Sequence, residues 1–374
     1  MKPSIELPEY PQEVEDWWWK QTIQQWPDLS EEKILNLIRK EIVLQSDRFN
    51  KTRSFDPQAY GSRELSILTY GNFFFPRTWK AMTLALSEAY SFREWNKPNK
   101  APIRILDIGS GSGASGLSAL FLLRKFNIEN SISLDSWDYS GKSLSIQKNI
   151  HRGCFDLWND TQIKTQRLDL RNELPPQKKQ RFDLILLGYS MNEILQNSEL
   201  NERVDWMKQI LGMLSTSGSV LIVEPAEKEV CNNLHETTAF LSSKEKDVFI
   251  HAPYFNGAPC PFFSERTHYY SHEVRKISSS ALIEKINKDN EGKPFQIINN
   301  RIVINIPMPP YLEIKNANKL DFDYFFSAFG MYSTIRAGSN ESYITKTQKQ
   351  CHELLALLRN YLREHDALKI NSKM

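Results

Sequence analysis

The sequence predicts an α/β fold built on a mostly parallel sheet, and two observations carry this prediction. From residue 103 onward, short apolar runs typical of buried parallel strands alternate with segments of helical periodicity. The first run, 103–108, leads into Gly109, Gly111 and Gly113, and a helix-periodic segment follows at once. These residues therefore form a strand, a glycine turn and a helix start, as in Rossmann-like sheets.

The composition is that of an ordinary globular protein. The 374 residues include 25 % charged and 40 % hydrophobic side chains, and the formal net charge of +2 does not by itself indicate a nucleic-acid or membrane surface. No apolar run approaches the roughly 18 residues of a membrane span, and the start lacks a signal-peptide core. The four cysteines form no Cys-x-x-Cys pair, which suits free thiols. We therefore expect a cytoplasmic protein with no membrane association.

Periodicity divides the chain into three parts. Residues 1–98 are expected to form an N-terminal helical region, in which Trp17, Trp18 and Trp19 pack inward. Residues 99–309 form the α/β core and include a loop at 252–277. Residues 310–374 form a C-terminal extension, with an amphipathic helix near its end at 345–368.

Apolar runs predict the strands of the core. They are expected at 103–108, 131–137, 166–168, 182–187, 219–223 and 248–251, followed by a late antiparallel pair at 295–298 and 301–306.

Acidic residues follow the second and third predicted strands and are candidate cofactor ligands. Asp138 suits a ribose diol, because one carboxylate accepts two hydroxyl hydrogen bonds, and Asp169 suits the edge of an adenine. The glycines alone leave the ligand open, since Gly111-x-Gly113-x-x-Gly116 is also a dinucleotide fingerprint. Alternatively, the glycine turn binds no ligand and Asp138 is an ordinary loop residue.

Asp107, two residues before Gly109, resembles the acid of the Asp/Glu-x-Gly-x-Gly-x-Gly signature of S-adenosylmethionine (SAM) methyltransferases. That resemblance implies SAM as cofactor, with Asp107 near its positively charged amino-acid end and Gly109, Gly111 and Gly113 beneath it. A late antiparallel strand on a parallel sheet is also usual for methyltransferases and unusual for dinucleotide dehydrogenases.

Several short patterns together resemble the methyltransferase-like family associated with the small ribosomal subunit of bacteria and mitochondria, over about residues 65–277. The patterns are Phe75-Pro76-Arg77-Thr78, the glycine segment, Tyr189-Ser190-x-Asn192-Glu193, Val223-Glu224-Pro225, His251-Ala252-Pro253-x-x-x-Gly257-x-Pro259-Cys260-Pro261 and Tyr269-Tyr270-Ser271. The resemblance implies ribosomal RNA or the small subunit as partner.

The chain departs from this family at the cysteines that bind an iron–sulfur cluster in mitochondrial relatives. Tyr254 replaces the first thiolate, Cys260 keeps the second, His268 lies near the third, and Cys351 is too distant to assign. One thiolate cannot hold a cluster, so we expect none. A zinc site from Cys260, His251, His268 and His272 is loosely spaced, and a packed or surface loop is the preferred interpretation.

The residues after the fourth strand are expected to meet the methyl acceptor. Glu193 is a candidate general base, although a glutamate at a helix start is also a simple cap. Asn192 is a candidate acceptor anchor, and Tyr189 is placed at both the cofactor and the acceptor. The loop 253–272 is either a lid that binds unpaired bases or a packed satellite core.

Two functions remain open at this point. The first is a methyltransferase acting on RNA of the small ribosomal subunit, or on a small molecule or protein. The second is an assembly or RNA-binding factor that keeps the fold without turnover. A single patch of Arg77, Lys80, Arg266, Arg275 and Lys276 would favour RNA.

Overall fold

The computed structural model describes residues 8–47, 63–92, 102–173, 175–176, 180–245, 247–252, 279–287 and 332–337.

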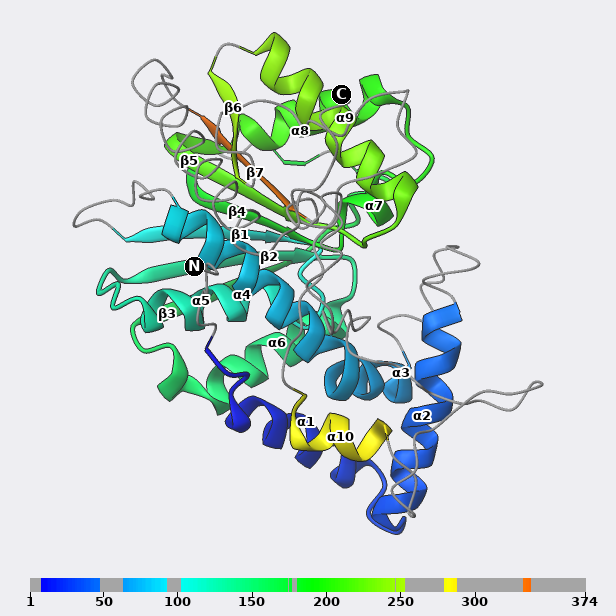
Figure 1. Ribbon diagram of the computed structural model, residues 1–374. Coiled ribbons are helices and arrows are strands. Elements are labelled where there is room, and N and C mark those ends of the chain that lie inside the picture. The colour runs from blue at the N-terminus through cyan, green and yellow to red at the C-terminus, as the bar shows by residue number, and fades with distance from the viewer. Residues whose placement is uncertain are drawn as a thin grey trace, which may run out of the picture.

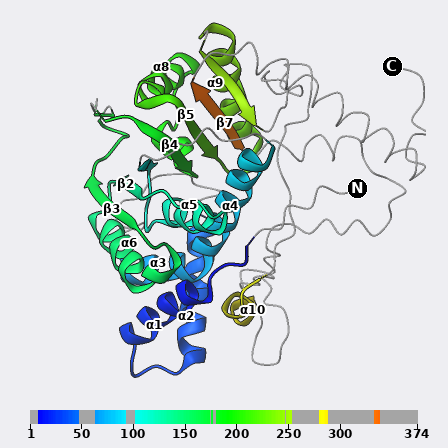
Figure 2. The same ribbon diagram turned by 90° about the vertical axis from the view of Figure 1, so that its left-hand side faces the viewer.

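A seven-stranded sheet forms the centre of the molecule (Figures 1 and 2). Its strands are β1 (Ile103–Ile108), β2 (Ile132–Asp138), β3 (Thr161–Arg167), β4 (Phe182–Gly188), β5 (Leu214–Val223), β6 (Val248–Ala252) and β7 (Tyr332–Ala337). They lie in the order β3-β2-β1-β4-β5-β7-β6. Strands β1 to β5 are parallel, whereas β7 runs antiparallel to β5 and β6. The predicted α/β fold, a Rossmann-like and mostly parallel sheet, is confirmed.

Two strand predictions need correction. β3 begins at Thr161 rather than at residue 166, because most side chains of this edge strand are half-buried or exposed and the strand contains no apolar run. β7 lies within 310–374, the part predicted to be a helical extension, so that prediction is wrong for Tyr332–Ala337. The expected pair at 295–298 and 301–306 and the helix at 345–368 lie outside the described residues.

Helices cover both faces of the sheet. On one face lie α4 (Phe75–Phe92), α5 (Ala114–Lys125) and α6 (Gly141–Gly153), and on the other α7 (Met191–Ile194), α8 (Leu200–Leu211) and α9 (Lys228–Lys244) (Figure 1). A short 3-10 turn, η3 (Phe155–Leu157), follows α6. β1 shows why helices pack on both faces. Its side chains alternate, so that Ile103 and Ile105 pack in the core beneath α4, α5 and α6, and Leu106 and Ile108 in the core beneath α8 and α9.

The N-terminal part of the chain is helical where it is described. It comprises α1 (Gln12–Gln25), α2 (Glu31–Asp47), α3 (Glu64–Thr69), the π-helical turn η2 (Tyr70–Phe74) and α4. Trp18 is buried in the main core, and a Cβ at Gly71 would lie 2.1 Å from the Trp18 ring, so η2 and α1 are in direct contact.

A distant segment, α10 (Ala281–Asn287), completes this helical layer and lies beside α1 and α2 (Figures 1 and 2). Arg39, 3 % exposed, donates from Nε to the carbonyl of Ile286 at 3.0 Å and from Nη2 to that of Lys285 at 2.8 Å. At the other end, Glu15 Oε1 accepts the Leu282 N–H at 2.9 Å. Both ends of α10 are therefore bound to the N-terminal helices.

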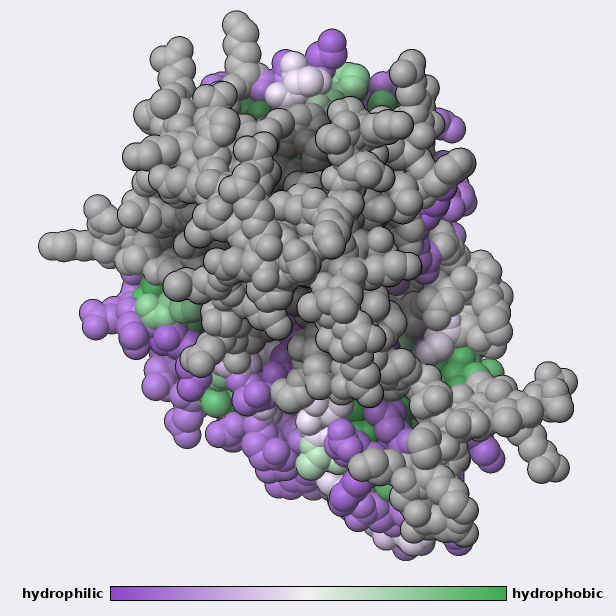
Figure 3. All heavy atoms as spheres, in the orientation of Figure 1, coloured by the Kyte–Doolittle hydropathy of each residue, from purple (hydrophilic) through white to green (hydrophobic). Residues whose placement is uncertain are grey.

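The described surface is largely hydrophilic in the view of Figure 3, with only separate hydrophobic spots. The large apolar side chains that are exposed, Ile23, Leu44 and Phe155, lie on three different elements. Among the described helices, none combines the length and the hydropathy of a membrane span.

Candidate functional site

The glycine turn lies where the strand order reverses, since the chain adds β2 and β3 on one side of β1 and β4 and β5 on the other. Gly109, Gly111 and Gly113 all have positive φ, at 67°, 52° and 94°. A Cβ at Gly109 would lie 2.4 Å from Ser190, and one at Gly113 would lie 2.4 Å from Gln147. A Cβ at Gly111 would meet nothing within 4 Å, so Gly111 presents bare backbone to open space.

Asp107 lies one layer behind this turn. It is fully buried, and its Oδ2 accepts the Gly116 N–H at 2.8 Å, which ties β1 to the start of α5. Its Oδ1 is buried without a hydrogen-bond partner among the described residues. Burial raises the pKa of Asp107 to about 7, against the effect of the Gly116 hydrogen bond, and Asp138 adds to the rise.

Asp138 closes the end of β2 against the same turn. Its Oδ2 accepts the Gly111 N–H at 2.9 Å, and its Oδ1 accepts the Ser140 N–H at 2.7 Å. Burial raises the pKa of Asp138 to about 6 despite these two bonds. Each oxygen keeps a free lone pair, so the carboxylate can still accept hydroxyl hydrogen bonds.

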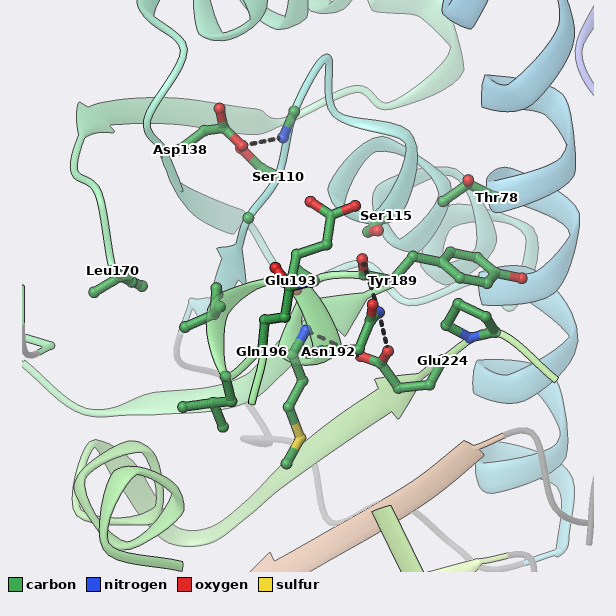
Figure 4. A pocket seen from close by; sticks show the side chains of 18 of the residues that line it. Thr78, Ser110, Ser115, Asp138, Leu170, Tyr189, Asn192, Glu193, Gln196 and Glu224 are labelled. Atoms are coloured by element: carbon green, nitrogen blue, oxygen red, sulfur yellow. Dashed lines mark hydrogen bonds between the residues drawn. The ribbon is translucent and has the colours of Figure 1, made fainter. Parts of the chain in front are cut away.

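A cavity of about 680 Å³ opens along this edge of the sheet. Gly109, Gly111, Asp138, Asp169, Tyr189, Asn192 and Glu193 line it, whereas Asp107 and Gly113 do not. Figure 4 shows Asp138 and Leu170 at one end, Tyr189 and Thr78 at the other, and Glu193 between them. The structure therefore brings together most of the predicted site residues.

Asp169 is less available than expected. It forms a two-pronged pair with Arg171, with Nε–Oδ1 at 2.7 Å and Nη2–Oδ2 at 2.6 Å, and also accepts from Asn172. The hydrogen bond from Arg171 lowers the pKa of Asp169 more than any other interaction does. Asp169 thus stays ionised and mainly fixes Arg171 beside the cavity.

Backbone strain marks the end of β4. Tyr189 has φ 61°, a left-handed conformation that a tyrosine rarely adopts. Its N–H donates to the carbonyl of Val223 at 2.7 Å, and Ser190 Oγ donates to that of Ile108 at 2.7 Å. These bonds hold the segment across β5 and β1 and begin α7 at the cavity.

Glu224, which belongs to the pattern Val223-Glu224-Pro225, shapes the site. Only 2 % exposed, it follows β5 and accepts the N–H of Met191 at 2.9 Å and that of Asn192 at 3.4 Å. The Asn192 side-chain amide also donates to it, as Figure 4 shows. Glu224 therefore caps α7 and engages the amide nitrogen of the predicted acceptor anchor. Burial raises its pKa to about 8.

Glu193 has the properties expected of a proton acceptor. Figure 4 shows its side chain extending into the cavity between Ser110 and Ser115. Burial first, and then the charge of Asp138, raise the pKa of Glu193 to about 7, and Arg171 opposes them. A carboxyl group with a pKa near neutrality can take up and release a proton under physiological conditions.

The N-terminal helices supply one wall of the cavity. Gln45, Ser66, Tyr70, Phe74, Arg77 and Thr78 belong to it. The rings of Tyr70 and Phe74 stack with centroids 6.2 Å apart. In the sequence, the signal for this wall is the aromatic turn at 70–77 that leads into a helix.

Other predicted features fall elsewhere. Lys80 is 6 % exposed and pairs with Glu9 at 3.0 Å, so it does not extend a basic patch from Arg77. The loop 253–272, with Cys260, His268, His272, Arg266, Arg275 and Lys276 in or near it, lies outside the described residues, as does Cys351. Within the described part of the chain, no cluster of metal-ligating side chains is found, and Cys154 and Cys231 are buried free thiols.

Comparison with known proteins places these features in a family. The profile described as "Mitochondrial small ribosomal subunit Rsm22" matches residues 64–306. No curated protein matches the chain.

Solved structures also match, at low identity. The SAM-bound amino pentose methyltransferase CalS10 from Micromonospora echinaspora is 16% identical over 41% of this chain and 53% of its own, with a TM-score of 0.27. A putative SAM-dependent methyltransferase from Methanococcus maripaludis is 19% identical over 47% and 68%, with a TM-score of 0.27. A ribosomal protein L11 methylase from Lactobacillus delbrueckii subsp. bulgaricus is 22% identical over 38% and 59%, with a TM-score of 0.25. The chain thus spans about half the length of CalS10.

The Rsm22 profile covers more than half of the chain, including the glycine turn, the end of β4 and the end of β5. This chain belongs to the Rsm22 family.

Proposed function

We propose that the chain binds SAM along the carboxyl edge of its sheet and transfers the methyl group to RNA of the small ribosomal subunit. The observation that carries the cofactor assignment is the cavity beside the glycine turn, with Gly111 facing open space and Asp138 at its adenosine end.

The charges around the cavity suit a cationic cofactor. Asp138, Glu193 and Glu224 line it, and Asp107 lies behind it with one oxygen unpartnered by the described residues. SAM carries a sulfonium and an ammonium. Both cations stabilise the ionised form of nearby carboxyl groups. A dinucleotide would instead place a pyrophosphate dianion among them. The buried acids therefore favour SAM over a nicotinamide cofactor.

When bound, SAM supplies an electrophilic methyl carbon. The chain would bind the ribose through Asp138 and hold the donor and acceptor in line within a partly closed cavity. Glu193 would accept the proton that the acceptor loses, and Tyr189 and Asn192 would border the acceptor.

The ribosomal acceptor rests on membership of the Rsm22 family, whose description names the mitochondrial small ribosomal subunit. Turnover of labelled SAM on purified small subunits tests it. We expect methylated RNA with the native chain, and in Glu193→Gln a loss of label that is much larger than any fall in SAM affinity.

One observation favours a second function, an assembly factor without turnover. The Asn192 amide nitrogen is engaged by Glu224 and lies 3.5 Å from the Tyr189 carbonyl, so it is less free to grip an acceptor. Copurified small subunits without any labelled product would support this function instead.

Gly111→Val tests the cofactor site. A branched side chain at Gly111 would occupy the open space where backbone approaches the ligand, and SAM affinity should fall more than tenfold, about 1.4 kcal/mol. Calorimetric titration measures this. Asn127→Val is the matched control, because Asn127 has a similar φ of 55° and does not line the cavity.

Equal SAM affinity in the native chain and Gly111→Val would refute the site. Binding of NAD but not SAM by the native chain would replace the methyltransferase assignment with a dinucleotide enzyme.

A further inference from the structure

Arg77 is a cation on the cavity wall that nothing in the site yet uses. It lies in the first turn of α4, which carries Thr78 at the Tyr189 end of the cavity. Its guanidinium lies 5.7 Å from the centroid of the Phe73 ring, and no hydrogen bond or ion pair joins it to another described residue. An arginine does not lose its charge in a protein, so a partly buried guanidinium here needs an anion or water.

The other arginines that line the cavity are already paired. Arg171 holds Asp169 at 2.6 Å, and Arg203 holds Glu236 at 2.5 Å and donates to the Thr237 hydroxyl. Among the described residues of the cavity wall, Arg77 therefore stands apart as a cation without an acidic partner.

The position of Arg77 identifies the anion. Asp138 and Leu170 lie at one end of the cavity and Tyr189 and Thr78 at the other (Figure 4). A cofactor whose ribose is bound by Asp138 extends its amino-acid end toward Tyr189, and that end carries a carboxylate beside its ammonium. The surrounding acids would repel this carboxylate unless a cation met it.

We propose that Arg77 binds the carboxylate of the SAM amino-acid moiety, through the two-pronged geometry that guanidinium groups form with carboxylates. The proposal rests on the proposed SAM site and adds the residue that recognises its anionic group. Arg77 acts here as a binding residue and takes no part in proton transfer.

Decarboxylated SAM tests the assignment, because it keeps the sulfonium and the amine and lacks only the carboxylate. Calorimetric titration of the native chain should show SAM binding at least about tenfold tighter than decarboxylated SAM. In Arg77→Met, SAM affinity should fall about tenfold, and affinity for decarboxylated SAM should change less than about twofold. Arg77→Lys should restore part of the preference. A folded Arg77→Met variant should still bind decarboxylated SAM. A variant that binds neither ligand is therefore misfolded.

Arg171→Met is the matched control, since Arg171 lines the same cavity but is bound to Asp169. It should leave the ratio of the two affinities unchanged. If Arg77→Met keeps the native ratio of SAM affinity to decarboxylated-SAM affinity, the proposal is overturned. It is also overturned if Arg77→Met loses only affinity for phosphate-bearing RNA, because Arg77 would then bind the acceptor. If the native chain binds neither cofactor, the SAM site itself is wrong.

Discussion

At the end of β5, the buried side chain of Glu224 shapes the site by holding the start of α7 in place. Its carboxyl group accepts two backbone N–H groups at the start of α7 and the amide of Asn192. A helix as short as Met191–Ile194 has almost no internal hydrogen bonds, so its start depends on such a cap. The placement of Asn192 and Glu193 at the cavity thus depends on Glu224.

The pKa of Glu224 predicts how stability changes with pH. Its ordinary value of 4.5 is raised to about 8 in the folded chain, so the folded state keeps a proton that the unfolded state has released. The free energy of unfolding should therefore fall as pH rises from about 4.5 to about 8. Glu224→Gln removes this group, and its stability should fall less steeply over that range in urea titrations.

Glu129→Gln is the control, because Glu129 is exposed and lies outside the cavity. Parallel slopes for the native chain and Glu224→Gln would contradict the assignment.

Among the elements, α10 shows how a short helix depends on contacts with distant parts of the chain. Seven residues do not form a stable helix alone, and α10 persists because Leu282, Ile283 and Ile286 pack in a small core with α2 and η2. Arg39 and Glu15 bind its two ends. The helical layer that forms one wall of the cavity is thus assembled from both early and late parts of the chain.

Arg39→Met tests this attachment. It leaves the carbonyls of Lys285 and Ile286 without their donor, and the free energy of unfolding should fall by about 1–3 kcal/mol. Hydrogen exchange should rise first at residues 281–287. Lys285→Gln, which removes only the exposed pair with Glu31, should cost less than about 1 kcal/mol. Unchanged exchange in Arg39→Met would show that packing and the Glu15 hydrogen bond hold α10 without Arg39.

At the scale of the whole molecule, the cavity concentrates acids in a chain whose net charge is only +2. The pKa values of Asp107 and Asp138 are raised to about 7 and about 6, largely because burial disfavours their charged forms. Ligand-free protein therefore retains protons at this site below neutrality, and a cationic ligand must displace them.

SAM affinity should consequently rise with pH and level off above about pH 8. Between pH 5.5 and 8 we expect a gain of about tenfold or more, since each group that ionises on binding contributes up to a factor of ten per pH unit. Titrations across this range measure it, and Asp138→Asn should flatten the curve. An affinity that falls with rising pH would show that the carboxyl groups bind the ligand in their neutral form.

The sequence predicted those parts of the fold and site that follow from local patterns. Gly109, Gly111 and Asp138 follow apolar runs, and the carboxyl ends of parallel strands meet at one edge, so their convergence could be expected. Arg77 could not be assigned in this way, because its position depends on how α4 packs across the sheet. The strand at 332–337 was missed because its partners, β5 and β6, lie far away in the sequence.

The place of β7 in the sheet bears on how the molecule is made. Ser219 of β5 pairs with Arg336 of β7, and β6 finds its described strand partner only in β7. During synthesis, β5 therefore emerges long before the strand that covers its open edge, and parallel pairing of β1 to β5 can precede closure of the sheet. Until Ala337 has left the ribosome, the nascent chain carries an unpaired strand edge that can join another copy. Chaperone demand should thus concentrate at the end of translation.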